Sequence, residues 1–270
     1  MINFSNGAMS HRLLVVLLFV CCSSMTMGQS QTVINQTDKN GKKQGHWIKT
    51  YPNGNVMYDG FFKNDQPDGD FKRYYEDKTL KSLLVFSRNG IEANATLYYP
   101  NGFVYSKGKY VSQLKEGRWQ FFSAITSGCL ISEEEYSKNL RNGLSVKYYP
   151  DSIVAEKLTY VNDIRNGEWI SYYPDGSLSF KTNNVNGKID GSFEAYYENG
   201  KLELSGHYKG DLREGLWHIY KKNGSLRFEI EYVAGIPKNL DLEIYQSDYI
   251  DSLEQNRIKI ADPEKTGEIW

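Results

Sequence analysis

The chain has 270 residues, with 24 glycines, 21 tyrosines, an aromatic share of 14% and a mean hydropathy of −0.58. This composition favours a solvated β protein over a helical one. Lysine and arginine (32) nearly balance aspartate and glutamate (33), so the overall charge has the footprint of neither a nucleic-acid-binding nor a membrane-surface protein. We therefore expect no nucleic-acid partner.

Residues 1–28 have the organisation of a secretory signal peptide. The basic pair His11-Arg12 precedes an apolar run from Leu13 to Val20, and Thr26-Met27-Gly28 forms a cleavage site with small residues at −3 and −1. The apolar run is too short for a membrane span, which needs about 20 residues. We expect export to the periplasm, the outer surface or the medium, with no integral membrane span.

Cys21 and Cys22 raise the alternative of a lipid anchor, because a bacterial lipobox also ends an apolar run with cysteine. A lipobox has glycine, alanine or serine directly before its cysteine, whereas Val20 precedes Cys21 and a second cysteine precedes Cys22. Cleavage after Gly28 is the favoured interpretation. It leaves Cys129 as the only cysteine, so no intrachain disulfide can form.

After an expected linker over residues 29–44, residues 45–238 contain an internal repeat. The interval between copies is 24 residues, except for 26 between Gly117 and Gly143, where we expect a longer turn over Ser123 to Ser127. Successive copies begin at Gly45, Gly69, Ala93, Gly117, Gly143, Gly167, Gly191 and Gly215.

Each copy predicts a β-hairpin. An aromatic residue such as Trp47 follows two positions after the start, and only Ala95 and Ser145 depart from this rule. A tyrosine-rich strand end then leads into a turn dipeptide such as Asn53-Gly54, which tolerates the positive φ angles of a type I′ turn. We expect a loop, such as Gly206 to Gly215, to lead from one copy to the next.

The returning strand of each copy has two apolar positions. It opens on valine or leucine, such as Val56, and in seven of the eight copies carries an aromatic ring six residues later, such as Phe62. Since side chains alternate across a strand, both positions are expected to face one way and the polar residues between them the other.

These features predict an all-β fold, an elongated single-layer antiparallel meander of about eight hairpins stabilised by stacking of neighbouring copies. Residues 239–270 are interpreted as a degenerate last unit and tail. In them, Leu240 to Tyr245 predicts a weak strand and Ser252 to Ile260 a short helix that covers the end of the sheet.

The run Gly-x-Trp-x-x-Tyr-Tyr-Pro-Asp-Gly of Gly167 to Gly176 has a counterpart at Gly191 to Gly200, followed by His207-Tyr208-Lys209-Gly210. Over about residues 41 to 238 this pattern resembles the MORN repeat variant of bacterial YwqK-family antitoxins. The resemblance implies a scaffold with a protein partner, and it implies binding and not catalysis. The period of 24 differs from the 23 of eukaryotic MORN repeats.

The candidate binding residues are the outward-facing tyrosines of the Tyr-Tyr pairs. Rows of exposed aromatic rings favour the binding of a peptide, a glycan or another chain. The alternative is that these rings only pack against their counterparts in the next copy. The candidates are Tyr74, Tyr98, Tyr148, Tyr172 and Tyr196.

The sequence lacks the arrangements typical of catalysis or metal binding. His46, His207 and His218 have no partner at ligand spacing, and Cys129 has no well-placed histidine. The run Glu133-Glu134-Glu135 alternates across a strand and is expected to be solvated. We therefore expect no enzyme, metal or cofactor. The alternative is a hydrolase in which His207 or His218 meets carboxylates in a concave pocket.

The sequence thus predicts an exported, non-catalytic scaffold that binds a protein or peptide along its sheet. A glycan or cell-wall binding module is an alternative that rests on the same aromatic row. An antitoxin-like partner that neutralises a toxin is another, and in its cytoplasmic form it requires that residues 1–28 are not exported.

Overall fold

The computed structural model describes residues 33–238 and 250–252. The expected signal peptide, Cys21, Cys22 and the weak strand over Leu240 to Tyr245 lie outside these residues. Ile250–Ser252 are helical, and the remainder of the helix expected over Ser252 to Ile260 is also outside them. The chain divides after Thr32 into two units, and only the second, from Val33 onward, contains described residues.

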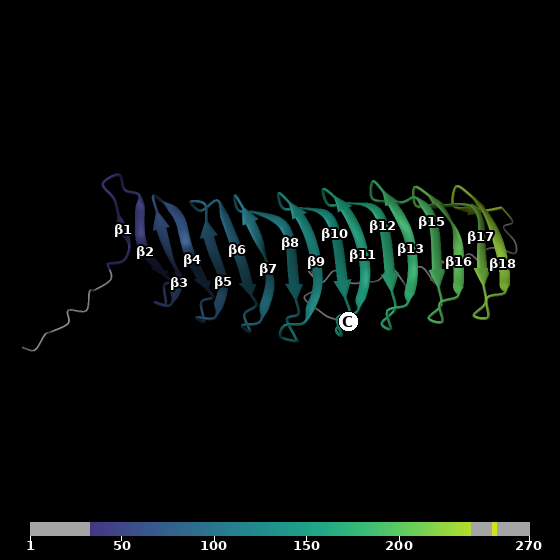
Figure 1. Cartoon of the computed structure of the whole chain (residues 1–270), viewed down its shortest axis with the longest axis horizontal. Coiled ribbons are helices and arrows are strands. Elements are labelled where there is room, and N and C mark those ends of the chain that lie inside the picture. The colour runs from purple at the N-terminus through teal and green to yellow at the C-terminus, as the bar shows by residue number, and fades with distance from the viewer. Residues whose placement is uncertain (1–32, 239–249, 253–270) are drawn as a thin grey trace, which may run out of the picture. The chain divides into compact units, whose positions relative to one another are not determined.

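The described residues form one antiparallel sheet in which each strand, apart from β14, pairs with the strand that follows it in the chain (Figure 1). β13 pairs with β15 as well as with the short β14. The predicted all-β meander is confirmed. The strands are β1 (Gln36–Thr37), β2 (Lys43–Thr50), β3 (Val56–Lys63), β4 (Gln66–Tyr74), β5 (Leu80–Ser87), β6 (Glu92–Tyr98), β7 (Val104–Val111), β8 (Leu114–Phe122), β9 (Leu130–Ser137), β10 (Leu140–Tyr148), β11 (Val154–Val161), β12 (Ile164–Tyr172), β13 (Leu178–Val185), β14 (Lys188–Ile189), β15 (Gly191–Tyr196), β16 (Leu202–Lys209), β17 (Leu212–Tyr220), β18 (Leu226–Val233) and β19 (Ile236–Pro237).

The Asn-Gly and Asp-Gly dipeptides lie in turns, but these turns are not type I′ as the sequence suggested. The Gly54 N–H donates to the Tyr51 carbonyl at 3.0 Å, and only Gly54 of the pair has a positive φ, 84°. This is a type I turn over Pro52 and Asn53, followed by a left-handed glycine. Pro52 favours this turn, because its ring fixes φ near the value that the first turn position of type I requires. Proline is not required, since the second copy has Glu76 in this place and makes the same bond, from the Lys78 N–H to the Tyr75 carbonyl at 3.0 Å.

The aspartate or asparagine of each turn has a local role. The Asn53 Oδ1 accepts a hydrogen bond from the Asn55 N–H at 2.9 Å, which replaces a backbone partner inside the turn. Six of the seven later copies repeat this bond from their turn residue, and the exception is the fourth copy, where the Ser123 hydroxyl oxygen accepts from the Ile125 N–H at 3.0 Å. The residues are Asp77, Asn101, Asp151, Asp175, Asn199 and Asn223.

Type I′ turns occur at the opposite edge of the sheet, where loops were expected. Asn64 and Asp65 both have positive φ, 52° and 68°, and they connect β3 to β4 directly. The segment Gly206 to Gly215 is likewise the end of β16, a two-residue turn at Gly210-Asp211 and the start of β17. The predicted loop is therefore wrong. The longer turn between Phe122 and Leu130, at the other edge, is confirmed.

A bulge after each Asn-Gly turn decides which side chains share a face. Thr50 pairs with Val56 and Lys49 pairs with Tyr58, so Met57 is an extra residue on β3. Paired residues project to the same face, and residues one apart project to opposite faces. Val56 therefore shares a face with Thr50, whereas Phe62 lies on the other. The expectation that Val56 and Phe62 face one way is wrong because of this bulge.

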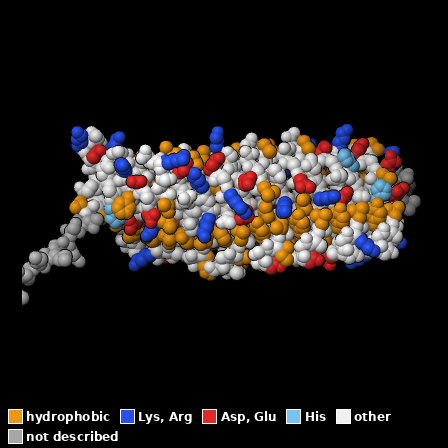
Figure 2. All heavy atoms as spheres, viewed as in Figure 1, with side chains coloured by type: hydrophobic (Ala, Val, Ile, Leu, Met, Phe, Trp, Pro, Cys, Tyr) orange, Lys and Arg blue, Asp and Glu red, His pale blue; other side chains and the backbone are white. Residues whose placement is uncertain are grey.

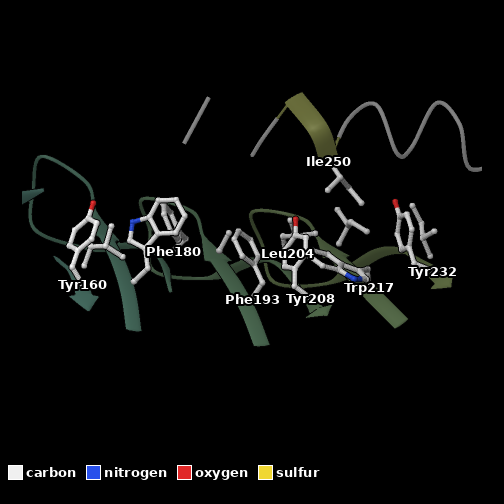
Figure 3. Packing of buried hydrophobic residues seen from close by; sticks show 13 residues of the cluster. Tyr160, Phe180, Phe193, Leu204, Tyr208, Trp217, Tyr232 and Ile250 are labelled. Carbon is white, nitrogen blue, oxygen red and sulfur yellow. The ribbon is translucent and has the colours of Figure 1, made fainter. Parts of the chain in front are cut away.

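We call the face that carries Trp47 and Phe62 the ring face, and the face that carries Val56 and the first tyrosine of each Tyr-Tyr pair the tyrosine face. The larger apolar cluster of the ring face includes Phe180, Phe193, Leu204, Trp217 and Ile250, which lie close together in Figure 3. A smaller cluster surrounds Trp119 and Phe121. Glycine allows the closest approach, because a Cβ on Gly206 would lie 2.1 Å from the Trp217 ring.

The second tyrosine of each pair connects its copy to the next. The Tyr51 hydroxyl donates to the Tyr74 carbonyl at 2.8 Å, and these two residues are 23 positions apart. The same bond recurs with the same separation along the sheet, which explains why the second position of the pair is tyrosine. The other donors are Tyr75, Tyr99, Tyr149, Tyr173 and Tyr197.

Candidate functional site

The five candidate tyrosines lie in one row on the tyrosine face, at the edge formed by the Asn-Gly turns. Each ends a strand and pairs with the first residue of the returning strand, a valine or leucine on the same face. Figure 2 shows a band of apolar side chains along this edge, in the lower part of the view. The pairs are Tyr74 with Leu80, Tyr98 with Val104, Tyr148 with Val154, Tyr172 with Leu178, and Tyr196 with Leu202.

All five tyrosine rings are half-buried. The valine and leucine partners are half-buried too, so two parallel rows of apolar side chains remain in reach of solvent. Because neighbouring copies are two strands apart, aromatic rings recur about every 10 Å along the row, with Phe122, which pairs with Leu130, in the place of a tyrosine between Tyr98 and Tyr148. The structure thus brings all five candidates together in one continuous strip.

The hydroxyl groups of the row fall into two sets. The Tyr148 hydroxyl donates to Glu133 Oε2 at 2.8 Å, and the Tyr196 hydroxyl donates to Glu194. Burial, together with these hydrogen bonds, raises the pKa of Tyr148 and of Tyr196. Within residues 33–238 and 250–252, no hydrogen bond holds the hydroxyl of Tyr74, Tyr98 or Tyr172. These three hydroxyls are available to a partner.

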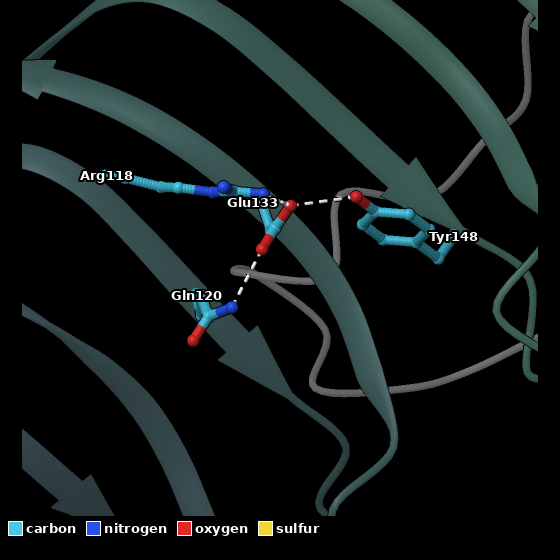
Figure 4. Close-up of polar contacts among 4 residues, drawn as sticks. All are labelled: Arg118, Gln120, Glu133 and Tyr148. Carbon is cyan, nitrogen blue, oxygen red and sulfur yellow. Dashed lines mark hydrogen bonds and ion pairs between the residues drawn. The ribbon is translucent and has the colours of Figure 1, made fainter.

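Glu133 sits at the centre of a polar cluster that the sequence did not reveal (Figure 4). Its carboxylate accepts from Gln120 Nε2 at 2.7 Å, from the Tyr148 hydroxyl and from the Arg118 guanidinium. Burial raises the pKa of Glu133, but these hydrogen bonds and the Arg118 charge outweigh burial and hold the pKa below its ordinary value. The hairpin register, which pairs Gln120 with Glu133, is the signal that would have found this cluster.

The three consecutive glutamates alternate across the sheet as expected, but two of them are not solvated. Glu133 is 6% exposed on the tyrosine face, and Glu134 is 2% exposed on the ring face, where it accepts from the Tyr136 hydroxyl at 2.6 Å. Only Glu135 is exposed. The prediction of solvation is wrong because hydroxyl and guanidinium partners from neighbouring positions compensate the buried charges.

A polar stretch also interrupts the ring face between its two apolar clusters. Lys147 Nζ lies 3.0 Å from Glu156 Oε1, and Trp169 Nε1 donates to Glu156 Oε2 at 3.0 Å. Lys147 pairs across the sheet with Ser132, and Glu156 pairs with Ser171. At Lys147 and Glu156, charge pairing and hydrogen bonds therefore replace the ring packing found at the same strand positions elsewhere, while Trp169 still packs on Phe180.

His46, His207 and His218 lie on the tyrosine face. His46 Nε2 is 2.7 Å from Asp59 Oδ1, and His218 Nε2 is 3.7 Å from Glu229 Oε2. His207 is exposed. In the part of the chain that the structure describes, no three histidine, cysteine or acidic residues are placed to hold a metal ion. A single histidine beside a single carboxylate offers no convergent acid, base and nucleophile.

Five segments of the chain match the MORN repeat variant family, at residues 43–64, 67–87, 141–162, 165–184 and 189–209. The chain therefore carries MORN repeat variant units, as the resemblance in the sequence indicated. No curated protein matches the chain. None of the described helical residues form a segment long and apolar enough to cross a membrane.

Among solved structures, the chain is similar to a chain of "Crystal Structure of TcdB2-TccC3-Cdc42". The match has 12% identity and a TM-score of 0.20, and it covers 68% of this chain and 13% of that chain. Our chain thus spans a small part of the length of that relative. A likeness at this TM-score supports no inference about function.

Proposed function

We propose that this chain of MORN repeat variant units is an exported, non-catalytic scaffold that binds a protein or peptide partner along its tyrosine face. The observation that carries the proposal is the row of five half-buried tyrosines beside a row of valine and leucine. Export is supported by the organisation of residues 1–28.

Tyrosine suits this role because its ring supplies apolar contact area and its hydroxyl supplies a hydrogen bond, with little side-chain entropy to lose. A ring about every 10 Å matches about three residues of an extended polypeptide. A partner that crosses the strands would therefore meet in turn Tyr74, Tyr98, Phe122, Tyr148, Tyr172 and Tyr196. Each contact is weak, and their sum gives the affinity.

Crosslinking and mass spectrometry in the native host would test the proposal. The test variant replaces Tyr74, Tyr98 and Tyr172 with serine, since these hydroxyls make no bond within the described residues. The matched control replaces Leu144 and Leu216 with serine, because both are exposed apolar residues on the same face, away from the tyrosine row. Loss of the crosslinked partner only in the test variant supports the proposal, and equal recovery from both variants contradicts it.

A glycan partner would use the same aromatic row, because sugar rings stack on aromatic side chains. Sedimentation with purified peptidoglycan separates the two ligands. If the protein sediments with peptidoglycan, and the variant with serine at Tyr74, Tyr98 and Tyr172 does not, the ligand of the tyrosine face is a glycan and not a protein.

Export has its own test. N-terminal sequencing of the protein from its host is expected to begin at Gln29, after cleavage at Gly28. A chain that keeps residues 1–28 would contradict export by signal peptide and would favour a cytoplasmic, antitoxin-like role. A lipid-modified N-terminal cysteine would instead indicate anchoring through Cys21 or Cys22.

A further inference from the structure

The N-terminal half of the ring face contains a groove of about 680 Å³. Its walls are rings and aliphatic side chains, and its floor is made of small side chains such as Ser82 and Ala93. The repeat explains the hollow, because Ser82 occupies the position that Phe180 and Phe228 occupy in later copies. The apolar lining includes Phe62, Phe71, Leu84, Phe86, Leu97 and Tyr110.

The groove is positively charged. Arg73 and Lys81 line it, and no aspartate or glutamate does so among the described residues. The Arg73 guanidinium lies 5.7 Å from the centre of the Phe71 ring, and Lys81 Nζ lies 5.2 Å from the centre of the Tyr75 ring. Neither cation makes an ion pair with a residue that the structure describes. An anionic group in the groove would thus meet two cations that lack a carboxylate partner.

At the C-terminal end of the ring face, a segment from outside the repeat packs on the sheet. Ile250 is fully buried in the cluster of Leu204, Trp217 and Ile230, above the sheet in Figure 3. The next residue, Asp251, lies 2.7 Å from Arg213. An apolar side chain followed by an acidic one therefore packs on this face, with the acidic group on a cation that lies over an aromatic ring.

The groove is built from the same repeat positions as the Ile250 site. Phe71 and Leu84 occupy the positions of Trp217 and Ile230, six copies earlier in the chain. The cations differ in position, because proline replaces Arg213 in this copy, whereas Arg73 and Lys81 lie nearer the Asn-Gly turn edge. An acidic side chain in the groove would therefore point towards that edge.

We propose that this groove binds a segment of another protein in which an apolar residue stands next to an acidic one. The apolar side chain occupies the space above Ser82, against Phe71 and Leu84, and the carboxylate pairs with Arg73 and Lys81. This site lies on the opposite face from the tyrosine row. It is a second binding surface, and Tyr98 is the one tyrosine of the row that also lines it.

Fluorescence anisotropy with a synthetic probe tests the proposal on the full chain. The probe is the fluorescein-labelled peptide of residues 246–256, which contains the Ile250-Asp251 pair. We expect saturable binding to the unsubstituted protein. The double variant Arg73→Glu, Lys81→Glu should weaken binding by about tenfold or more, since two charge-assisted contacts become repulsive.

Three further measurements assign the site. Ser82→Phe, which fills the groove with the side chain found at this position in later copies, should weaken binding by a similar factor. Lys107→Glu with Lys157→Glu, a matched charge change on the tyrosine face, should leave binding within about twofold. A probe that carries Asp251→Lys and Glu254→Lys has these two acidic groups replaced by cations. The Arg73→Glu, Lys81→Glu variant of the protein should bind this probe more tightly than it binds the original probe. Such binding would also show that the variant is folded.

The proposal is overturned if the probe does not bind, or if Ser82→Phe and the double charge reversal leave its binding unchanged. Sedimentation velocity tests a different occupant: a dimer that the Arg73→Glu, Lys81→Glu variant abolishes would assign the groove to a second copy of the chain and also overturn it. Serine at Tyr74 and Tyr172, neither of which lines the groove, should not change probe binding, so failure here and failure of the tyrosine-face proposal are distinguishable.

Discussion

In the last copies of the repeat, Leu204, Trp217 and Ile230 are at most 1% exposed, and Ile250 packs against them. In the second copy, Phe71 and Leu84 occupy the positions of Trp217 and Ile230 but border an open groove. Both regions have the same strands and turns. The comparison teaches that the repeat determines the hairpin backbone, whereas a few side chains decide whether the ring face is a core or a surface.

The largest expected effect comes from removing one side chain at the same repeat position in each region. Ile230→Ala should lower the free energy of unfolding by about 3 kcal/mol, because a fully buried isoleucine leaves a cavity. Leu84→Ala should cost about 1 kcal/mol, since Leu84 already borders the groove. Urea denaturation measures both values, and equal costs would break the comparison.

Replacing a glycine that lies under an aromatic ring by alanine tests the same difference between the packed region and the groove. A Cβ at position 206 would lie 2.1 Å from the Trp217 ring, and one at position 60 would lie 2.2 Å from the Phe71 ring. Gly206→Ala should destabilise the protein by about 2 kcal/mol through overpacking. Gly60→Ala should cost less, because Phe71 can shift towards the groove. Thermal unfolding of the two variants checks this order, and a greater loss for Gly60→Ala would show that the groove does not accommodate the ring.

The Glu133 cluster supplies a pH-dependent test at the junction between the two regions. The folded pKa of Glu133 is lowered, so its contribution is present above the unfolded pKa of about 4.3 and is lost as the pH falls through the folded value. Glu133→Gln should lower the free energy of unfolding at pH 7 by about 1.5 kcal/mol. The difference from the unsubstituted protein should shrink towards pH 3 in a denaturation series. A difference that is constant with pH would contradict the charged role of Glu133.

The smallest expected effect concerns the hydroxyl bonds between copies, which are the same in both regions. Tyr197→Phe and Tyr75→Phe each remove one hydrogen bond of 2.8 Å to a carbonyl in the next copy. Each should cost about 1 kcal/mol. Chemical denaturation of both variants in parallel is the measurement. Equal costs would show that these hydroxyl bonds contribute the same stability beside the groove and in the packed C-terminal copies. A markedly larger cost at Tyr197 would show that the bond contributes less beside the groove.

Much of the fold could be predicted from local chemistry. Asn53 and Gly54 marked a turn because a left-handed glycine and a side-chain acceptor act within a few residues. The turn type was misjudged because the turn begins one residue earlier than the Asn-Gly pair suggests, both where Pro52 is present and where Glu76 takes its place. The short turn at Asn64-Asp65 was missed because its residues carry a weaker signal than Asn-Gly. Each error concerns only one or two residues, but it changes which residues of neighbouring strands are expected to pair.

The candidate site was harder to predict. The repeat alone placed Tyr74, Tyr98, Tyr148, Tyr172 and Tyr196 in equivalent positions. Their neighbours could not be assigned, because the extra residue at Met57 and its counterparts moves the valine and leucine row to the tyrosine face. Glu133 was missed for a related reason, since its partner Arg118 is 15 positions away in the preceding strand.

The sequence by itself determined the period, the turn sites and the succession of hairpins, because these depend on the φ preferences and hydrogen bonds of residues close together in the chain. Only the tertiary structure decided which side chains share a face, where carboxylates are buried and which half of the ring face is open. Those properties depend on contacts between strands and between copies, as in the bond from Tyr51 to a residue 23 positions later, and one bulge is enough to change them.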